Sequence, residues 1–355
     1  MKQLTRKLTL SALVCAFGMT LAQGSLAQER EVIIQGGSPV PYLGYLPVYV
    51  AQGAGFFKEE GLKATMNYAA NAGMSVQLVA AGNGDISLNT HEPVIQGRGK
   101  GLNTTIFATI NRSLLYYIAV PPDSNIRSAA DLAGKKIGVS NLGSSALPIL
   151  KSLLDESGVK YTDATFLPVG VGGQALAALR SGQVDALGLW DGIYFAMERG
   201  GAKFNYIYHP SLHQFGDLGL AMADKVSAEQ SDKICAAGRA IAKATLFIVE
   251  NPEAVVKMYW AANPAARGTG DEAQAFKDTL GEVQKMATTF GKGTGPDNRF
   301  GTYDAKKFEA FVAMLKKQNY INAAPPLAEV ASNAMFDCMN KFDAAAVREA
   351  ARKWK

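Results

Sequence analysis

The sequence predicts an α/β protein of two lobes, with additional helices at the C-terminus. The chain has 355 residues, more than one hydrophobic core usually organises, so two lobes or domains are favoured. Short β-branched runs alternate with amphipathic helical patterns over the first two thirds, which is typical of parallel sheets covered by helices. The last third contains helical patterns alone.

Apolar runs of strand length, bounded by Gly, Asn, Asp or Pro, predict the strands. They cover residues 31–35, 85–88, 104–109, 116–120, 136–139, 165–168 and 186–189. Amphipathic stretches between and after these runs predict the helices. They cover residues 46–57, 75–81, 146–157, 173–181, 227–259, 271–289 and 304–318.

Turn and capping residues mark several boundaries. Gly61 suits the left-handed position that ends the first helix. Ser128 and Asp131 have the spacing of a capping box with Asp in place of Glu, and Gly134 ends that short helix before the next strand. Asn-Pro pairs, of which Asn251-Pro252 is the first, interrupt the helical tail.

Residues 1–27 have the pattern of a secretory signal peptide. Three cations precede a mostly apolar run over 8–21, and small residues stand before a cleavage point ahead of Gln28. A lipid anchor at Cys15 is the alternative, but Val14 occupies the position where a small residue is expected. We therefore expect a chain that is exported through this leader.

Composition and charge exclude several classes of protein. Hydrophobic residues make up 48% and charged residues 19% of the chain, as in globular proteins. The leader carries three cations and no acid, so its removal lowers the net charge from +5 to +2. No mature segment concentrates Lys and Arg among aromatic residues, so nucleic acid is not expected as a partner. No mature stretch reaches the ~18 apolar residues of a membrane span.

Cys235 and Cys338 are the cysteines that remain in the mature chain. An even number in an oxidising compartment favours one disulfide, and two buried free thiols are the alternative. Neither residue lies in a C-x-x-C or metal-ligand pattern, and no cofactor is expected. His209, His213 and Asp217 recur at four-residue intervals, but neighbouring Pro and Gly residues argue against the helix that a metal site would need.

Four segments of the chain are distinctive: 44–62 (GYLPVYVAQGAGFFKEEGL), 84–87 (GDIS), 126–139 (IRSAADLAGKKIGV) and 177–186 (AALRSGQVDA). They closely resemble segments of one family, the nitrate/sulfonate/taurine group of ABC-transporter solute-binding proteins. The resemblance implies a type II periplasmic binding fold, in which hinged lobes close on a ligand in the cleft between them. Lobe 1 would comprise residues 28–115 and 219–355, and lobe 2 residues 116–218.

The function that the resemblance implies is capture of a small molecule and its delivery to an ABC permease without chemical change. We expect a monomer, and a sensor or adaptor with the same fold is an alternative. The resemblance extends to fungal-type thiamine pyrimidine synthases, which use a cysteine-rich segment, a histidine and a lysine-bound pyridoxal phosphate. Only Cys235 and Cys338 remain in the mature chain, far apart in sequence, which argues against such an enzyme.

Loops at the carboxyl ends of the strands are the expected ligand contacts, because ligands of open parallel sheets gather there. Gly143, Ser144 and Ser145 lie between a strand and a helix, where hydroxyls and free N–H groups favour an anion. The resemblance likewise implies contact with an oxyanion, whereas an ordinary N-cap needs no ligand. Gln174, before the next helix, is a weaker candidate of the same kind.

Further candidates follow the other strands. Trp190 could stack on a ligand and Asp191 could accept from its amine, and Ser38, Tyr42 and Tyr45 are expected opposite them. His91 and Glu92 could orient a polar group, and Arg112 could pair with a carboxylate or sulfonate. Core packing, a satisfied turn histidine and a surface salt bridge are the alternative roles of these residues. We expect an organic sulfonate or carboxylate, with a pyrimidine as the second choice.

Overall fold

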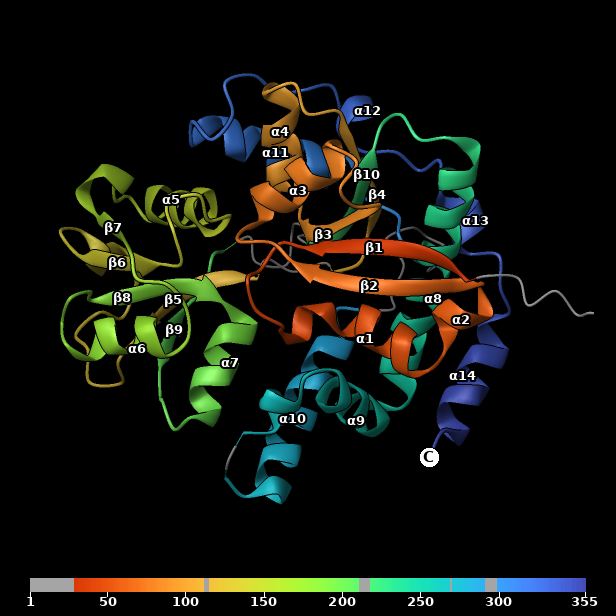
Figure 1. Cartoon of the computed structure of the whole chain (residues 1–355). Coiled ribbons are helices and arrows are strands. Elements are labelled where there is room, and N and C mark those ends of the chain that lie inside the picture. The colour runs from red at the N-terminus through yellow and green to blue at the C-terminus, as the bar shows by residue number, and fades with distance from the viewer. Residues whose placement is uncertain (1–28, 112–114, 211–217, 269, 291–298) are drawn as a thin grey trace, which may run out of the picture.

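Two five-stranded sheets covered by helices form two lobes (Figure 1). The computed structural model describes residues 29–111, 115–210, 218–268, 270–290 and 299–355. The first sheet has the strand order β2-β1-β3-β10-β4, and the second has the order β7-β6-β8-β5-β9. The α/β fold class with two lobes is therefore confirmed.

The strands are β1 (Arg30–Gly36), β2 (Leu62–Tyr68), β3 (Ile86–Thr90), β4 (Thr104–Thr109), β5 (Tyr116–Val120), β6 (Lys136–Val139), β7 (Thr165–Pro168), β8 (Ala186–Trp190), β9 (Asn205–Ile207) and β10 (Leu218–Ala223). The helices are α1 (Leu46–Gly53), α2 (Phe56–Glu59), α3 (Ala72–Ala80), α4 (Glu92–Gly99), α5 (Ala146–Glu156), α6 (Gly173–Arg180), α7 (Asp191–Arg199), α8 (Ala228–Glu250), α9 (Pro252–Ala262), α10 (Glu272–Ala287), α11 (Ala305–Lys317), α12 (Leu327–Val330), α13 (Phe336–Met339) and α14 (Ala344–Lys353).

The sheets are not wholly parallel, which corrects the expectation from the alternating pattern. In the first sheet β10 runs antiparallel to β3 and β4, and in the second β5 runs antiparallel to β8 and β9. Each of these two strands is the first after the chain has passed from one sheet to the other. A strand that enters from the side where the parallel strands end must run away from that side, so its direction is reversed.

Two strands at the sheet edges were not predicted. β2 has only its first residue, Leu62, fully buried, and β9 is three residues long. Edge strands that face water lack the apolar run on which the prediction depended. The helix predicted over 46–57 is divided into α1 and α2 at Gly55, whose φ of 81° is left-handed.

The same local contact sets the register of both sheets. Asp85 stands before β3, and its Oδ2 accepts a hydrogen bond from Ile33 N–H in β1 at 2.9 Å. Asp185 stands before β8, and its Oδ2 accepts from Lys136 N–H in β6 at 2.8 Å. These carboxylates explain why the two lobes carry similar Asp-containing segments, since each aligns a neighbouring pair of parallel strands.

The C-terminal helices cover the first lobe and also reach the second. Helix α8 packs against α1, while α10 contacts α7 and α11 contacts α5 (Figure 1). Gln318 Nε2, just after α11, donates to Asp155 Oδ2 of α5 at 3.0 Å. Arg199 of α7 donates to Thr279 Oγ1 of α10 at 3.4 Å. The tail therefore joins the lobes through polar contacts from two separate helices.

None of the helices among the described residues is long and apolar enough to cross a membrane.

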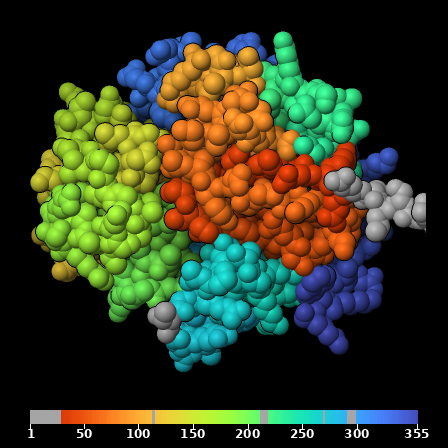
Figure 2. Space-filling model, viewed as in Figure 1, coloured from red at the N-terminus to blue at the C-terminus, as the bar shows by residue number. Residues whose placement is uncertain are grey.

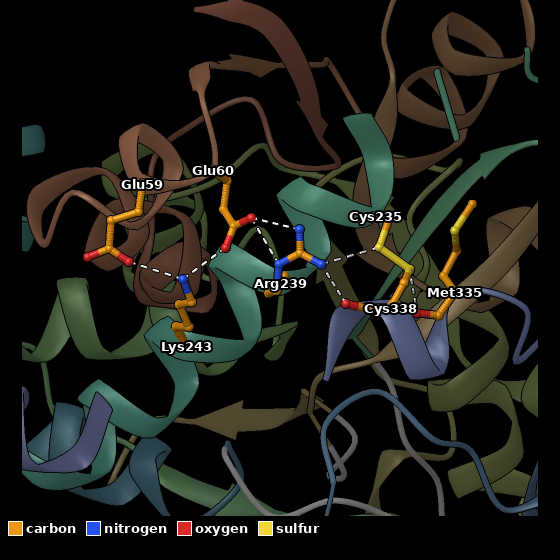
Figure 3. Close-up of polar contacts among 7 residues, drawn as sticks. All are labelled: Glu59, Glu60, Cys235, Arg239, Lys243, Met335 and Cys338. Atoms are coloured by element: carbon orange, nitrogen blue, oxygen red, sulfur yellow. Dashed lines mark hydrogen bonds and ion pairs between the residues drawn. A yellow bond between two sulfur atoms is a disulfide. The ribbon is translucent and has the colours of Figure 1, made fainter. Parts of the chain in front are cut away.

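A buried ionic cluster fixes α8 to the rest of the first lobe (Figure 3). Arg239 of α8 donates to Glu60 Oε2 from Nε at 2.9 Å and from Nη2 at 2.7 Å. Lys243 donates to Glu60 Oε1 at 2.8 Å and to Glu59 Oε2 at 3.0 Å. Burial alone would raise the pKa of Glu60, but the hydrogen bonds from Arg239 and Lys243 hold that pKa below its ordinary value.

A disulfide lies beside this cluster. Cys235 of α8 and Cys338 of α13 are bonded, with their Cα atoms 6.0 Å apart. Arg239 Nη1 also donates to the carbonyl oxygen of Cys338 at 2.7 Å. The short helix α13 is thus attached to α8 by both a covalent bond and a charged hydrogen bond.

We expect Glu60→Gln to lower the free energy of unfolding by about 2–4 kcal/mol at neutral pH, because two cations lose a largely buried carboxylate. Glu59→Gln is the matched control, since the Glu59 side chain is 56% exposed, and it should cost less than about 1 kcal/mol. Urea unfolding measures both.

The lowered pKa of Glu60 gives this comparison a pH dependence. Its carboxylate stabilises the folded state fully above the unfolded value of 4.5, and the contribution is lost as the pH falls through the lower folded value. The difference between wild type and Glu60→Gln should therefore shrink in acid. A difference that is constant from neutral pH into acid would contradict the assignment.

Candidate ligand-binding site

A pocket lies between the lobes, where the ends of their strands meet. Its volume is about 30 Å³, far below the ~300 Å³ or more of a typical small-ligand site, so the lobes have to move apart before a ligand can enter. Figure 2 shows the yellow and green second lobe pressed against the red and orange first lobe. The described residues that line the pocket are Gly37, Ser38, Pro39, Tyr42, Tyr45, Ala70, Asn71, Ala72, Asn89, Thr90, Tyr116, Ser140, Asn141, Ser144, Ser145 and Trp190.

Close backbone packing forms the floor of the pocket on the first lobe. A Cβ atom on Gly37 would lie 2.6 Å from Asn89 Cβ and 2.9 Å from Ala72 Cα, so only glycine fits at the end of β1. Asn89 is held by buried hydroxyls, because its Nδ2 donates to Ser75 Oγ at 2.7 Å and also to Ser87 Oγ. The asparagine that meets the pocket is therefore fixed from behind.

Aromatic rings from both lobes form one wall. Tyr42 of the first lobe lies 6.0 Å from Trp190 of the second, and Trp190 lies 6.4 Å from Tyr116, both edge to face. Tyr45 contacts Tyr42 at 4.5 Å and accepts a hydrogen bond from Ser38 N–H through its hydroxyl at 2.7 Å. Burial raises the pKa of Tyr45, so its hydroxyl stays neutral. These rings offer flat apolar area to a ligand.

The loop before α5 forms the opposite wall. Ser144 Oγ accepts from Ala146 N–H at 3.2 Å, and Asn141 Oδ1 accepts from Gly143 N–H at 2.9 Å. Ser145 is the residue before the helix, but its side chain makes no capping hydrogen bond. Asn141 and Ser144 thus stabilise the loop through these hydrogen bonds, and the Ser145 hydroxyl does not take part in capping the helix.

Three buried polar atoms on pocket residues have no hydrogen-bond partner among the described residues. They are Thr90 Oγ1, Ser145 Oγ and Trp190 Nε1, and the three residues are 4%, 3% and 7% exposed, respectively. Unpaired buried polar groups are costly and rare, so a cluster of them in a pocket points to a ligand. In addition, no described lining residue carries a charged side chain.

The sequence predictions fall into three groups. The first group lines the pocket and comprises Ser38, Tyr42, Tyr45, Ser144, Ser145 and Trp190. The second group lies outside the lining and comprises Gly143, Gln174, His91, Glu92 and Asp191. The third is Arg112, which lies outside the described residues.

Local structure explains why the second group lies elsewhere. Gly143 and Gln174 are exposed. His91 is buried with its ring 5.7 Å from Phe308 of α11, and Glu92 is fully buried as the first residue of α4. Asp191 begins α7, and its Oδ1 accepts from Gly192 N–H at 2.6 Å.

Two lining residues, Asn71 and Tyr116, were missed by the sequence prediction for different reasons. Asn71 follows β2, and because that edge strand was not predicted, its loop was not considered. Tyr116 begins β5, and the prediction considered only loops that follow the carboxyl end of a strand. Because β5 runs antiparallel to β8, the first residue of β5, Tyr116, is paired with Trp190 at the end of β8. Asn89 and Ser140 lie in loops that the prediction did select.

The described residues contain no group of three or more side chains that could hold a metal ion. Of the histidine pattern, only His209 is described, and its Nε2 lies 3.3 Å from Ser152 Oγ and 3.6 Å from Glu156 Oε1.

A pocket closed between two α/β lobes is the architecture of a periplasmic binding protein. The alkanesulfonate-binding protein SsuA from Xanthomonas axonopodis pv. citri bound to MOPS has this fold. It superposes with a TM-score of 0.66 at 18% identity, covering 85% of this chain and 98% of that one. Residues 44–255, more than half of the chain, match the family described as NMT1/THI5 like, and the chain belongs to this family.

Two curated relatives are similar along much of the chain. The formylaminopyrimidine-binding protein of Halalkalibacterium halodurans is 26% identical over 295 residues, covering 82% of this chain and 86% of the relative. The 4-amino-5-hydroxymethyl-2-methylpyrimidine phosphate synthase of Schizosaccharomyces pombe is 24% identical over 247 residues, covering 66% and 70%. Proteins similar to this chain are thus named for binding and for synthesis.

The position of Asp191 generates a test of pH dependence. Burial raises its pKa from 3.8 to about 6, although the Gly192 N–H bond lowers it. A raised carboxyl pKa means that the folded state binds the proton more tightly, so ionisation of Asp191 costs stability as the pH rises from about 4 to about 6.

We therefore expect Asp191→Asn to gain stability relative to wild type by roughly 2 kcal/mol between pH 4 and pH 7.5. Chemical unfolding at both pH values measures the change. Asp123→Asn, at an exposed carboxylate, is the control and should show no such gain. If Asp191→Asn behaves like the control, burial of the Asp191 carboxyl is refuted.

Proposed function

We propose that this protein is the substrate-binding component of an ABC importer and that it captures an uncharged, pyrimidine-type molecule between its lobes. The observation that carries the proposal is the pocket lining, which combines aromatic rings with hydroxyl and amide groups and includes no charged side chain among the described residues. A flat heteroaromatic ring with nitrogen acceptors and an amine matches these groups. The relative named for formylaminopyrimidine binding supports the same class.

This proposal places a pyrimidine first, whereas the sequence analysis favoured an organic sulfonate or carboxylate over a pyrimidine. An organic anion is usually paired with Arg or Lys or with several N–H groups, because burial of an unpaired charge is costly. A sulfonate is the second candidate, favoured by the position of Ser144 and Ser145 before α5, where the dipole of the helix favours an anion. The fold shared with an alkanesulfonate-binding protein is compatible with it.

Binding without conversion is the proposed activity. The resemblance implies that the related synthases use a cysteine-rich segment, whereas Cys235 and Cys338 are joined in a disulfide and neither lines the pocket. We further propose that residues 1–27 direct export, that the mature monomer works in the periplasm, and that a permease in the inner membrane receives the ligand. Recovery of a periplasmic form that begins at Gln28 tests the export step.

A thermal-shift panel on protein stripped of carried ligand tests the ligand class. A ligand at about 100 times its Kd adds about 2.7 kcal/mol, which moves the midpoint by several degrees. We expect a shift with formylaminopyrimidine or 4-amino-5-hydroxymethyl-2-methylpyrimidine and none with MOPS, taurine or nitrate. A shift with MOPS alone would replace the pyrimidine by the sulfonate.

Two further readouts complete the test. The Kd should change less than about twofold between about 0.05 and about 0.5 M salt, because none of the described lining residues is charged. The mass of the bound molecule should be unchanged after long incubation. Turnover of the pyrimidine would contradict a binding function and favour an enzyme.

A further inference from the structure

We infer that Thr90, Ser145 and Trp190 together make closure of the lobes dependent on the ligand and determine which ligand is accepted. This inference rests on the proposed binding function, because it assigns the recognition step to three side-chain atoms. Each atom is buried, has no hydrogen-bond partner among the described residues, and belongs to a residue that lines the pocket.

The three groups come from both lobes. Thr90 ends β3 in the first lobe, whereas Trp190 ends β8 and Ser145 precedes α5 in the second. The contact between Tyr42 of the first lobe and Trp190 of the second also joins the lobes, at a ring separation of 6.0 Å. The arrangement described here is therefore the closed one, in which neither lobe alone encloses the three atoms.

Their effect on closure follows from solvation. When the lobes separate, water can bond to a hydroxyl or an indole N–H in the cleft. When they close without a ligand, these bonds to water are lost and no group among the described residues replaces them, which is unfavourable for each atom. A ligand that bonds to all three removes the penalty, so the closed state is favoured when the correct molecule is bound.

The same atoms define the chemistry of the ligand. An indole N–H can only donate, so the ligand must place an acceptor against Trp190. The hydroxyls of Thr90 and Ser145 can donate or accept, and they therefore tolerate either kind of group. A molecule that lacks these polar atoms would leave the three groups unpaired, and discrimination against it is correspondingly strong.

The chain offers matched controls. Thr104 Oγ1 and Trp260 Nε1 are also buried without a partner among the described residues, but neither residue lines the pocket. Thr104→Val and Trp260→Phe repeat the chemistry of Thr90→Val and Trp190→Phe outside the lining of the pocket. Any general effect of removing an unpaired polar atom is shared by both sets.

The first arm uses the empty protein. Small-angle X-ray scattering compares wild type, the triple variant Thr90→Val/Ser145→Ala/Trp190→Phe and the double control Thr104→Val/Trp260→Phe. We expect the empty triple variant to have a smaller radius of gyration than empty wild type, because closure no longer buries unpaired groups. The control should match wild type. A triple variant as open as wild type overturns the inference about closure.

The second arm measures binding by calorimetry, with formylaminopyrimidine and MOPS as the probes. For the probe that wild type binds, each of Thr90→Val, Ser145→Ala and Trp190→Phe should weaken the affinity by about 10-fold or more. The control variants should stay within about twofold. Variants that bind as wild type does would overturn the recognition role.

The two arms separate this inference from the proposed function. If wild type binds MOPS but no pyrimidine, the ligand class fails while the three groups are still tested on MOPS. If wild type binds neither probe, the proposed ligand is refuted, and the scattering comparison of the empty proteins still decides the inference. Circular dichroism shows that each variant is folded before either comparison is made.

Discussion

The cost of burying polar groups without partners is the constraint on which the site depends. A closed cleft between two lobes must keep water out of its depth, and the strand ends that meet there bring hydroxyl, amide and indole groups with them. Most of these are satisfied inside the protein, as Asn89 is by Ser75 and Tyr45 is by Ser38. The few that are not constrain what the pocket can hold, because a ligand that pairs them removes the cost of burying them in the closed state.

The rest of the fold positions these groups. Reversal of β5 and β10 lets the chain pass between the lobes on the side where the parallel strands end, so that both sheets present their strand ends to one pocket. Gly37 allows the end of β1 to approach Asn89, and Asp85 and Asp185 align the neighbouring strands. The ionic cluster around Glu60 and the disulfide lie away from the pocket and stabilise the tail, which in turn contacts both lobes.

The fold class and most of the pocket loops were predictable from the sequence, because buried strands and amphipathic helices have strong periodicity. Ser38, Tyr42, Ser144, Ser145 and Trp190 were selected for this reason. Asn71 was missed because an edge strand such as β2 has little apolar signal, and Tyr116 because strand direction is a tertiary property. His91 and Asp191 follow the right strands, but the first turn of a helix directs them into packing that no local pattern reveals.

A crystal structure of the protein with bound formylaminopyrimidine tests the central claim most directly. The account requires the ligand in the pocket between the lobes, with Thr90 Oγ1, Ser145 Oγ and Trp190 Nε1 each within hydrogen-bond distance of it and an acceptor facing the indole. A ligand bound elsewhere, or one bound in the cleft while these three atoms remain unpaired, would contradict it.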